Sequence, residues 1–128
     1  MEIAKIFIVD DDVNIVMLFE KILVFEGHEV IAKAYNGEEA LRKFKNLHDN
    51  PDIVIMDHRM PIKNGVETTK EMLNLKSNTK IIFASADYKV KDLAKEVGAV
   101  DFLEKPFDFP TLFAMIEKHT LIKNRIAQ

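Results

Sequence analysis

Residues 53–57 read Ile-Val-Ile-Met-Asp, four apolar residues that end at an aspartate. A run this short cannot form a stable helix, and its branched side chains favour a strand that is buried on both faces. Comparable runs occur at Lys5–Val9, Glu29–Ala34, Lys80–Ala84 and Val100–Leu103. The sequence therefore predicts five strands.

Segments with helical spacing of apolar residues separate and follow these strands. They span Val13–Phe25, Glu38–Leu47, Val66–Leu75, Val90–Val97 and Phe109–Ile122. Strict alternation of strand and helix with short connections predicts a doubly wound α/β fold, in which helices cover both faces of one parallel sheet. The 128 residues, 48% of them hydrophobic, suffice for one domain, which we expect to cover residues 1–128.

Residues at the expected helix ends agree with this division. Gly27 and Gly98 stand just past two helices, where a left-handed backbone conformation is common. Asn64 and Asp108 stand where helix N-caps are expected, and Asp12 is interpreted as a cap as well.

Composition excludes several functions. The formal net charge of -3 provides no positive field for nucleic acid or anionic membrane, so direct nucleic-acid binding is not expected. The absence of cysteine excludes disulfides, thiolate zinc sites and cysteine nucleophiles, and it fits a reducing cytoplasm. No signal peptide or membrane-spanning segment is recognisable, so we expect a cytoplasmic location without membrane attachment.

Polar side chains follow four of the five expected strands. The residues are Asp10, Asp11, Asp57, Ser85 and Lys105. Because ligands of open parallel sheets bind outside the carboxyl ends of the strands, we expect these side chains to converge. Three neighbouring carboxylates would repel one another unless a cation lay among them, and oxygen ligands suit magnesium. Lysine and serine could neutralise a phosphoryl group, which an aspartate can accept.

This ordered set of motifs resembles the CheY-like receiver domains of two-component response regulators. The resemblance covers nearly the whole chain and implies a flavodoxin-like (βα)5 fold with strand order 2-1-3-4-5. It is carried by Ile6–Asp11, by Ile53–Asp57 with Met60-Pro61 and Gly65, by Ser85-Ala86 and by Lys105-Pro106-Phe107.

The resemblance implies that Asp57 accepts a phosphoryl group in a two-component or phosphorelay system. The expected donor is the phosphohistidine of a histidine kinase or phosphotransfer protein. Asp10, Asp11, Asp57 and the backbone carbonyl of Arg59 are expected to bind Mg2+.

The resemblance also implies a signalling switch rather than an enzyme. Lys105 and Ser85 are expected to contact the phosphoryl oxygens, and Phe102 is expected to turn inward when Ser85 moves towards them. The surface from the fourth strand to the fifth helix would then control an unidentified downstream protein. Residues expected on that surface are Tyr88, Val90, Lys91, Lys95, Phe102 and Glu104.

Three charged or titratable residues stand beside the expected site: His58, Arg59 and Asp87. Arg59 and Asp87 have opposite charges, so we expect them to pair across the mouth of the site and to lengthen the phosphoryl lifetime by hindering water. His58 is interpreted as a solvated loop residue without a chemical role.

The helix at Val13–Phe25 is apolar around most of its girth. Most of these side chains must enter the core, but a helix of this kind can leave an apolar patch for a kinase docking domain or a second copy in a homodimer.

Two alternatives stay open. In the first, Asp10 is the nucleophile of a haloacid dehalogenase-type phosphatase, because Asp10-Asp11-Asp12-Val13 mimics its DxDx motif, although Asp57 then has no nucleophilic role. In the second, the chain is a receiver fragment cut from a larger regulator. A degenerate receiver that takes no phosphate is disfavoured, because all five expected site residues are present.

Overall fold

The computed structural model describes the backbone of residues 3–127 and the side chains of residues 3–120. The strands are β1 (Lys5–Val9), β2 (Glu29–Ala34), β3 (Ile53–Met56), β4 (Lys80–Ser85) and β5 (Asp101–Glu104). The helices are α1 (Val13–Phe25), α2 (Gly37–Asn46), α3 (Gly65–Leu75), the short 3-10 helix η1 (Tyr88–Val90), α4 (Lys91–Glu96) and α5 (Phe109–Ala127).

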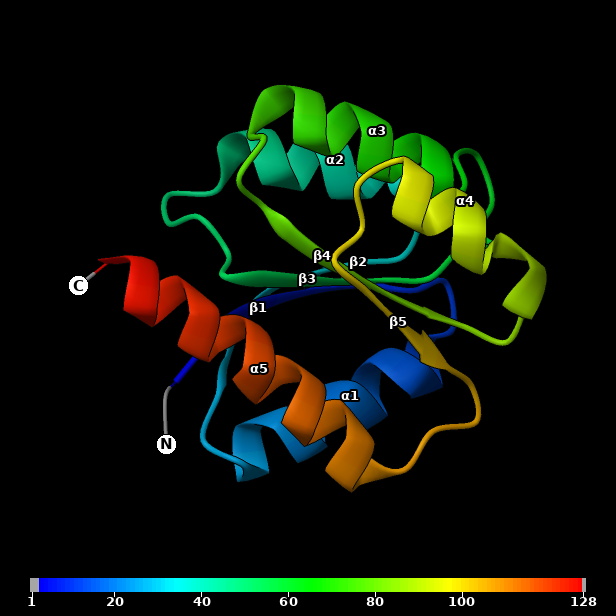
Figure 1. Ribbon diagram of the computed structural model, residues 1–128. Helices are drawn as coiled ribbons and strands as arrows, with labels where there is room; N and C mark the ends of the chain where they lie inside the picture. Colours follow the sequence, from blue (N-terminus) through cyan, green and yellow to red (C-terminus); the bar gives the residue numbers. More distant parts are fainter. Residues whose placement is uncertain (1–2, 128) are drawn as a thin grey trace.

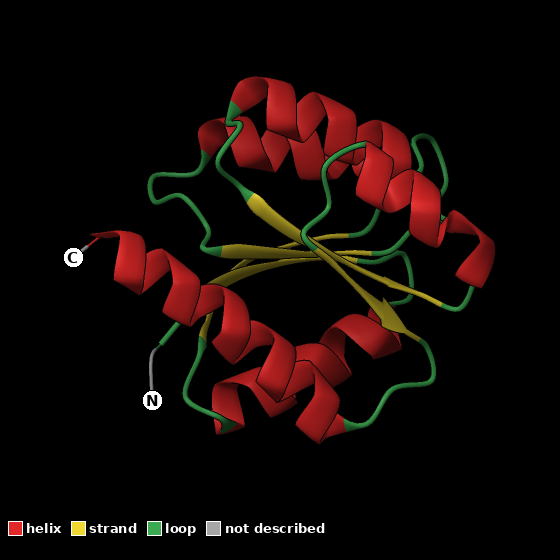
Figure 2. Cartoon of the chain, viewed as in Figure 1, coloured by secondary structure: helices red, strands yellow, loops and turns green. Residues whose placement is uncertain are grey.

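The five strands form one parallel sheet in the order β2-β1-β3-β4-β5. Helices α1 and α5 cover one face, and α2, α3 and α4 cover the other, which produces three layers (Figures 1 and 2). The predicted fold class and strand order are confirmed. Within residues 3–127, no helix is both long and apolar enough to cross a membrane.

Alternating side chains of the sheet divide the core in two. On β1, Phe7 belongs to the core beneath α2, α3 and α4, whereas Ile6 and Ile8 belong to the core beneath α1 and α5. All four residues of the central strand β3 are buried. This burial explains why the central strand reads as a continuous apolar run.

The helix ends follow the expected local signals. Asp12 caps α1 by accepting hydrogen bonds from the backbone N–H groups of Asn14 and Ile15 at 2.9 and 3.3 Å. Gly27 and Gly98 follow α1 and α4 with φ angles of 100° and 111°, a conformation that glycine adopts without steric cost.

Some boundaries differ from the sequence-based prediction. β5 lies one residue later than Val100–Leu103, because its register with β4 runs from Asp101 to Glu104. The expected helix Val90–Val97 consists of the end of η1 followed by α4, and α5 extends past Ile122 to Ala127.

Candidate functional site

The connections at the carboxyl ends of the strands enclose one cavity of about 550 Å3. All five expected site side chains contribute to its wall, as do Arg59 and Asp87, the pair expected at its mouth. The lining residues are Asp10, Asp11, Asp12, Ile15, Asp57, Arg59, Ser85, Ala86, Asp87 and Lys105. The convergence that the strand ends predict is therefore present.

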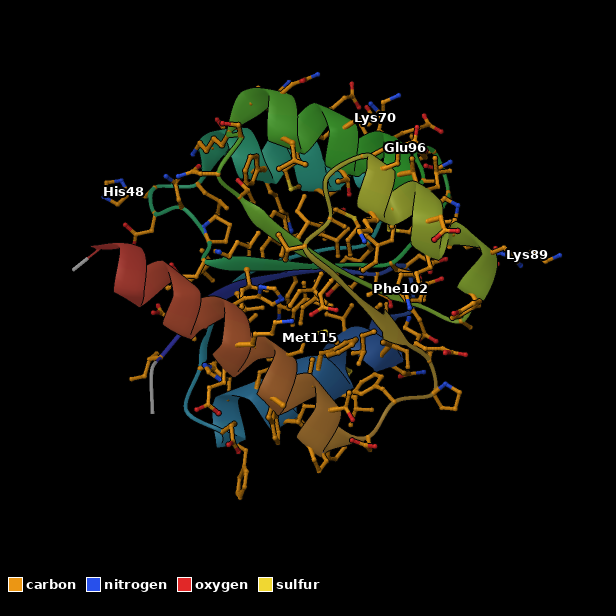
Figure 3. The ribbon with its side chains drawn as sticks, in the orientation of Figure 1. His48, Lys70, Lys89, Glu96, Phe102 and Met115 are labelled. Atoms are coloured by element: carbon orange, nitrogen blue, oxygen red, sulfur yellow. The ribbon has the colours of Figure 1, made fainter. Side chains whose placement is uncertain are left out.

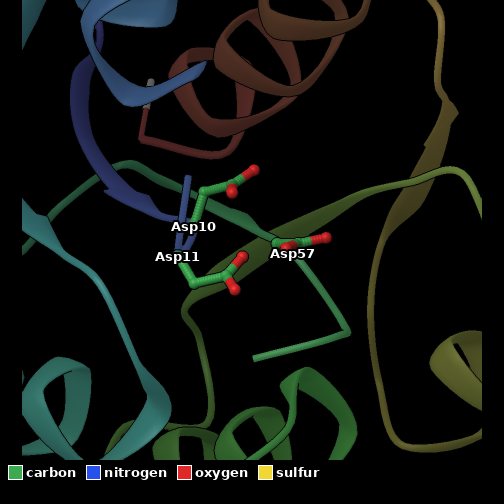
Figure 4. Close-up of side chains that lie close together, drawn as sticks. All are labelled: Asp10, Asp11 and Asp57. Carbon is green, nitrogen blue, oxygen red and sulfur yellow. The ribbon is translucent and has the colours of Figure 1, made fainter. Parts of the chain in front are cut away.

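Three carboxylates meet in this cavity. One oxygen each from Asp10, Asp11 and Asp57 lies within 4.8 Å of the other two (Figure 4). The backbone holds two of these residues in place, because the N–H of Asp57 donates to the Val9 carbonyl at 2.9 Å and that of Asp10 to the Ala34 carbonyl at 3.1 Å. The sheet thus presents the carboxylates at fixed positions.

The pKa of Asp57 is raised from 3.8 to about 6, chiefly by burial and also by the neighbouring Asp10 carboxylate, while Lys105 lowers it. Positive charge beside this carboxylate favours its ionised form. The atoms that could bind a metal here are carboxylate oxygens, the ligands that a hard cation such as Mg2+ prefers. The three aspartates therefore fit a magnesium ion.

Lys105 reaches into the cavity from the end of β5. Its Nζ lies 2.7 Å from Asp10 Oδ2 and 3.6 Å from Asp57 Oδ1. Its backbone N–H donates to the Ser85 carbonyl at 2.9 Å, and the following Lys105-Pro106 bond is cis. The side chain therefore brings a positive charge close to Asp57.

Ser85 ends β4 and is almost fully buried. Its hydroxyl accepts a hydrogen bond from the backbone N–H of Asp87 at 3.0 Å. This is the turn contact typical of serine, yet it leaves the hydroxyl hydrogen available for donation to another group.

Arg59 and Asp87 form the predicted ion pair at the cavity mouth, with 3.3 Å between Nη2 and Oδ2. The Arg59 side chain is 81% exposed, and the other oxygen of Asp87 accepts from the N–H of Lys89 at 3.1 Å. An exposed pair of this kind contributes little to stability, about 0–1 kcal/mol. Its effect on phosphoryl lifetime stays a prediction.

His58 is partly buried and not fully solvated as expected. Its ring lies against Phe83, with 6.5 Å between the ring centroids, and burial lowers its pKa below 6.5. Its Nδ1 atom is buried without a hydrogen-bond partner in the described part of the chain.

Gly65 is a site residue whose role sequence reasoning missed. A Cβ atom at Gly65 would lie 2.2 Å from the Asp57 carbonyl oxygen, and the N–H of Gly65 donates to the His58 carbonyl at 2.9 Å. The start of α3 thus packs directly against the backbone of Asp57. The only signal in the sequence was the position of Gly65 after Met60-Pro61 in the recognised motif.

Phe102 occupies β5 and is partly buried against the core beneath α4 (Figure 3). Its backbone N–H donates to Asp101 Oδ1 at 2.9 Å, and Asp101 Oδ2 lies 3.0 Å from His119 Nε2 on α5. Lys91 and Lys95 join Phe102 in lining a groove of about 210 Å3 between α4 and β5.

One residue expected on the surface from the fourth strand to the fifth helix is not exposed there. Val90 is buried, because the last residue of η1 faces the core beneath α4. Tyr88, by contrast, is exposed as expected.

The first helix does leave apolar side chains uncovered. Val16, Phe19 and Leu23 enter the core. The exposed apolar residues of α1 are Val13, Met17, Leu18, Val24 and Phe25.

Comparison with known proteins agrees with this geometry. Residues 6–117 match the response regulator receiver domain, and the chain belongs to that family. It is similar to the chemotaxis protein CheY of Thermotoga maritima, with 41% identity over 105 residues, which are 80% of this chain and 86% of that protein.

Solved structures of receiver domains share the fold of this chain. A response regulator receiver domain protein from Clostridium thermocellum superposes with a TM-score of 0.89 at 28% identity, covering 97% of this chain and 99% of that one. CheY in a CheX-CheY-BeF3-Mg2+ complex from Borrelia burgdorferi superposes with a TM-score of 0.84 at 31% identity, covering 89% of this chain and 87% of that one. The chain is thus a CheY-like receiver domain of two-component signalling, and nothing supports the phosphatase alternative.

Proposed function

We propose that Asp57 is the phosphoacceptor of this receiver domain and takes its phosphoryl group from the phosphohistidine of a histidine kinase or phosphotransfer protein. The observation that carries this proposal is the placement of Asp57 in the cavity, beside two further carboxylates and 3.6 Å from Lys105 Nζ. Among the carboxylates that line the cavity, only Asp57 combines a recessed position and a nearby cation with a place directly after the central strand.

In the proposed reaction, a carboxylate oxygen of Asp57 attacks the phosphorus atom. The bond between phosphorus and the donor imidazole breaks, the imidazole keeps the electron pair, and an aspartyl phosphate forms. A magnesium ion held by Asp10, Asp11, Asp57 and the backbone carbonyl of Arg59 would offset the negative charge of the transferring group. Lys105 can turn from Asp10 towards a phosphoryl oxygen and supply a second positive charge.

The same site suggests how the phosphoryl group is sensed. The Ser85 hydroxyl would donate its hydrogen to a phosphoryl oxygen, and Phe102 would move into the space that this shift leaves. The surface from β4 to α5 would change with it and alter affinity for a downstream protein. The CheX-CheY complex supports a protein as the kind of partner.

The ion pair of Arg59 and Asp87 is proposed to slow hydrolysis of the aspartyl phosphate. It spans the cavity mouth, through which an attacking water must pass. The apolar face of α1 is proposed to contact the kinase docking domain or a second copy of the chain. The net charge of -3 makes direct contact with nucleic acid unfavourable, and we place the chain in the cytoplasm as a switch rather than an enzyme.

The test is phosphorylation by acetyl phosphate, followed by intact mass spectrometry and peptide mapping. We expect one phosphoryl adduct that requires Mg2+, maps to Asp57 and is absent in Asp57→Asn. The matched control Asp12→Asn, which keeps a helix-capping side chain, should be phosphorylated normally. An adduct on Asp10 would instead support the phosphatase alternative.

A further inference from the structure

Two buried side-chain atoms lack a hydrogen-bond partner in the part of the chain that the structure describes. They are Nδ1 of His58 and Oγ1 of Thr69. A buried polar group without a partner destabilises a fold, so native proteins contain few of them. Each of the two atoms is therefore expected to find a partner in another state of the protein.

Thr69 differs from the other buried threonines of the described helices. Thr68, its neighbour on α3, donates its hydroxyl hydrogen to the Asn64 carbonyl at 2.7 Å. Thr120 on α5 donates in the same way to the Ile116 carbonyl at 2.8 Å. A bond to the carbonyl four residues earlier is the usual arrangement for a threonine within a helix. Thr69 is fully buried without such a bond, so its hydroxyl is available to a group outside α3.

The position of Thr69 directs its side chain towards His58. Gly65 lies one helical turn before Thr69, and a Cβ atom at Gly65 would lie only 2.9 Å from His58 Cα. Side chains of a helix lean towards its N-terminus, so Thr69 projects over the turn that contains Gly65. The imidazole of His58 lies on the same face of the sheet, because it contacts Phe83 in the core beneath α2, α3 and α4. Both unpaired atoms therefore face the contact between α3 and the end of β3.

The two groups are also chemically complementary. A neutral imidazole has one donor nitrogen and one acceptor nitrogen, and a hydroxyl group can both donate and accept. Thr69 therefore matches Nδ1 of His58 in either neutral tautomer. A single hydrogen bond between them would satisfy both buried atoms at once.

The backbone of His58 ties this pair to the acceptor. Its N–H donates a hydrogen bond to the Asp57 carboxylate, and its carbonyl accepts from the N–H of Gly65 at 2.9 Å. Transfer of a phosphoryl group to Asp57 removes the charge of the carboxylate, which weakens the bond from the His58 N–H. Phosphorylation therefore loosens the contact that holds His58 in its present position.

We propose that Thr69 Oγ1 and His58 Nδ1 form a hydrogen bond when Asp57 is phosphorylated, and that Thr69 is a positioning residue, which stabilises the phosphorylated state through His58. This inference rests on the proposed function and extends it to a residue of α3 that does not line the cavity. In the unphosphorylated chain the two buried groups stay unpaired and lower its stability. Phosphorylation satisfies both groups, so the pair favours the phosphorylated state.

The experiment uses beryllofluoride with Mg2+ as a stable mimic of the phosphoryl group, at pH 8, where an imidazole is neutral. Thr69→Val removes the hydroxyl and keeps the shape of the side chain, and His58→Phe removes the ring nitrogens and keeps an aromatic ring. Thr120→Val is the matched control, because it removes a buried threonine hydroxyl that already has a partner. The readouts are the melting temperature of the chain without ligand and the dissociation constant for beryllofluoride.

For Thr69→Val we expect the melting temperature without ligand to rise by about 2–4 °C, because an unpaired buried hydroxyl is removed. The dissociation constant for beryllofluoride should rise about five- to tenfold, because the bond to His58 is lost. His58→Phe should raise it by a similar factor, and the double variant should lose no more than either single variant. Thr120→Val should lower the melting temperature and leave the dissociation constant unchanged.

An unchanged dissociation constant in Thr69→Val overturns the inference. A lower melting temperature of Thr69→Val without ligand also overturns it, because the hydroxyl would then have a partner, such as a fixed water, before phosphorylation. Additive losses in the double variant would show that the two residues act independently and overturn their pairing. Failure of the proposed function looks different: the unaltered chain would bind no beryllofluoride and take no phosphoryl group on Asp57.

Discussion

Replacing Asp57 by asparagine should stabilise the chain when no divalent cation is present. Burial, reinforced by Asp10, raises the pKa of Asp57 from 3.8 to about 6 although Lys105 lowers it. In the unfolded chain the carboxyl group titrates near its ordinary value, about 3.9. Above both pKa values the ionised carboxylate is therefore less favourable in the folded state than in the unfolded state.

The pKa difference sets the size of the effect. The shift from 3.8 to about 6 is about two pKa units, and ~1.36 kcal/mol per unit makes this about 3 kcal/mol of lost stability at pH 8. The penalty is complete above the folded pKa. It shrinks as the pH falls from about 6 towards 4, because the folded chain takes up the proton before the unfolded chain does.

The assay is urea unfolding in EDTA at pH 8, 6 and 4.5. Asp57→Asn should be more stable than the unaltered chain by about 2–3 kcal/mol at pH 8 and by only about 1 kcal/mol at pH 4.5. Added Mg2+ should narrow the gap at pH 8, because it stabilises the carboxylates of the unaltered chain. Asp12→Asn, an exposed N-cap variant, should stay within about 0.5 kcal/mol. Equal stability at pH 8 in EDTA, or a gap that widens on acidification, refutes the reasoning.

Three further outcomes follow from individual contacts. Arg59→Ala should shorten the phosphoryl half-life several-fold, because it opens the cavity mouth to water. Mass spectrometry follows the half-life, and Arg42→Ala is the control. An unchanged half-life would contradict the proposed role of the ion pair between Arg59 and Asp87. Gly65→Ala should lower the free energy of unfolding in urea by about 1–3 kcal/mol and slow phosphorylation, because its Cβ would lie 2.2 Å from the Asp57 carbonyl oxygen. Unaltered values would mean that α3 can shift freely. Burial lowers the pKa of His28, whose Nδ1 accepts a hydrogen bond from the backbone N–H of Ala4 at 3.1 Å. The contribution of His28 to the free energy of unfolding should therefore be complete above pH 6.5 and decline as the pH falls below it. His28→Asn should lack this decline, and an equal decline in both proteins would mean that another group causes it.

Much of the fold can be predicted from the sequence because the signals for strands, helices and caps are local. Burial on both faces requires the continuous apolar run of Ile53–Met56, and the cap at Asp12 depends on the two amides that follow it. The register between strands is a different matter. The limits of β5 depend on pairing with β4, which no local pattern encodes, so the predicted strand lay one residue too early.

The candidate site was predictable to the extent that it follows from strand ends. Asp10, Asp57 and Lys105 each stand directly after a strand of one parallel sheet, and parallel strands bring such positions to one edge. Opposite charges at Arg59 and Asp87 likewise indicated the pair at the mouth.

Only the tertiary structure decided how the connections fold. The partial burial of His58 against Phe83 and the packing of Gly65 against Asp57 arise from contacts between β3, β4 and α3. The positive φ of Ile62 runs against the preference of its own residue type and is imposed by anchors on α2 and α3. The sequence by itself thus determined the sheet, its helices and the identity of the acidic edge, because these depend on apolar patterns and strand ends. The shape of the loop beside the acceptor depends on distant contacts, and for that reason it was visible only in the folded chain.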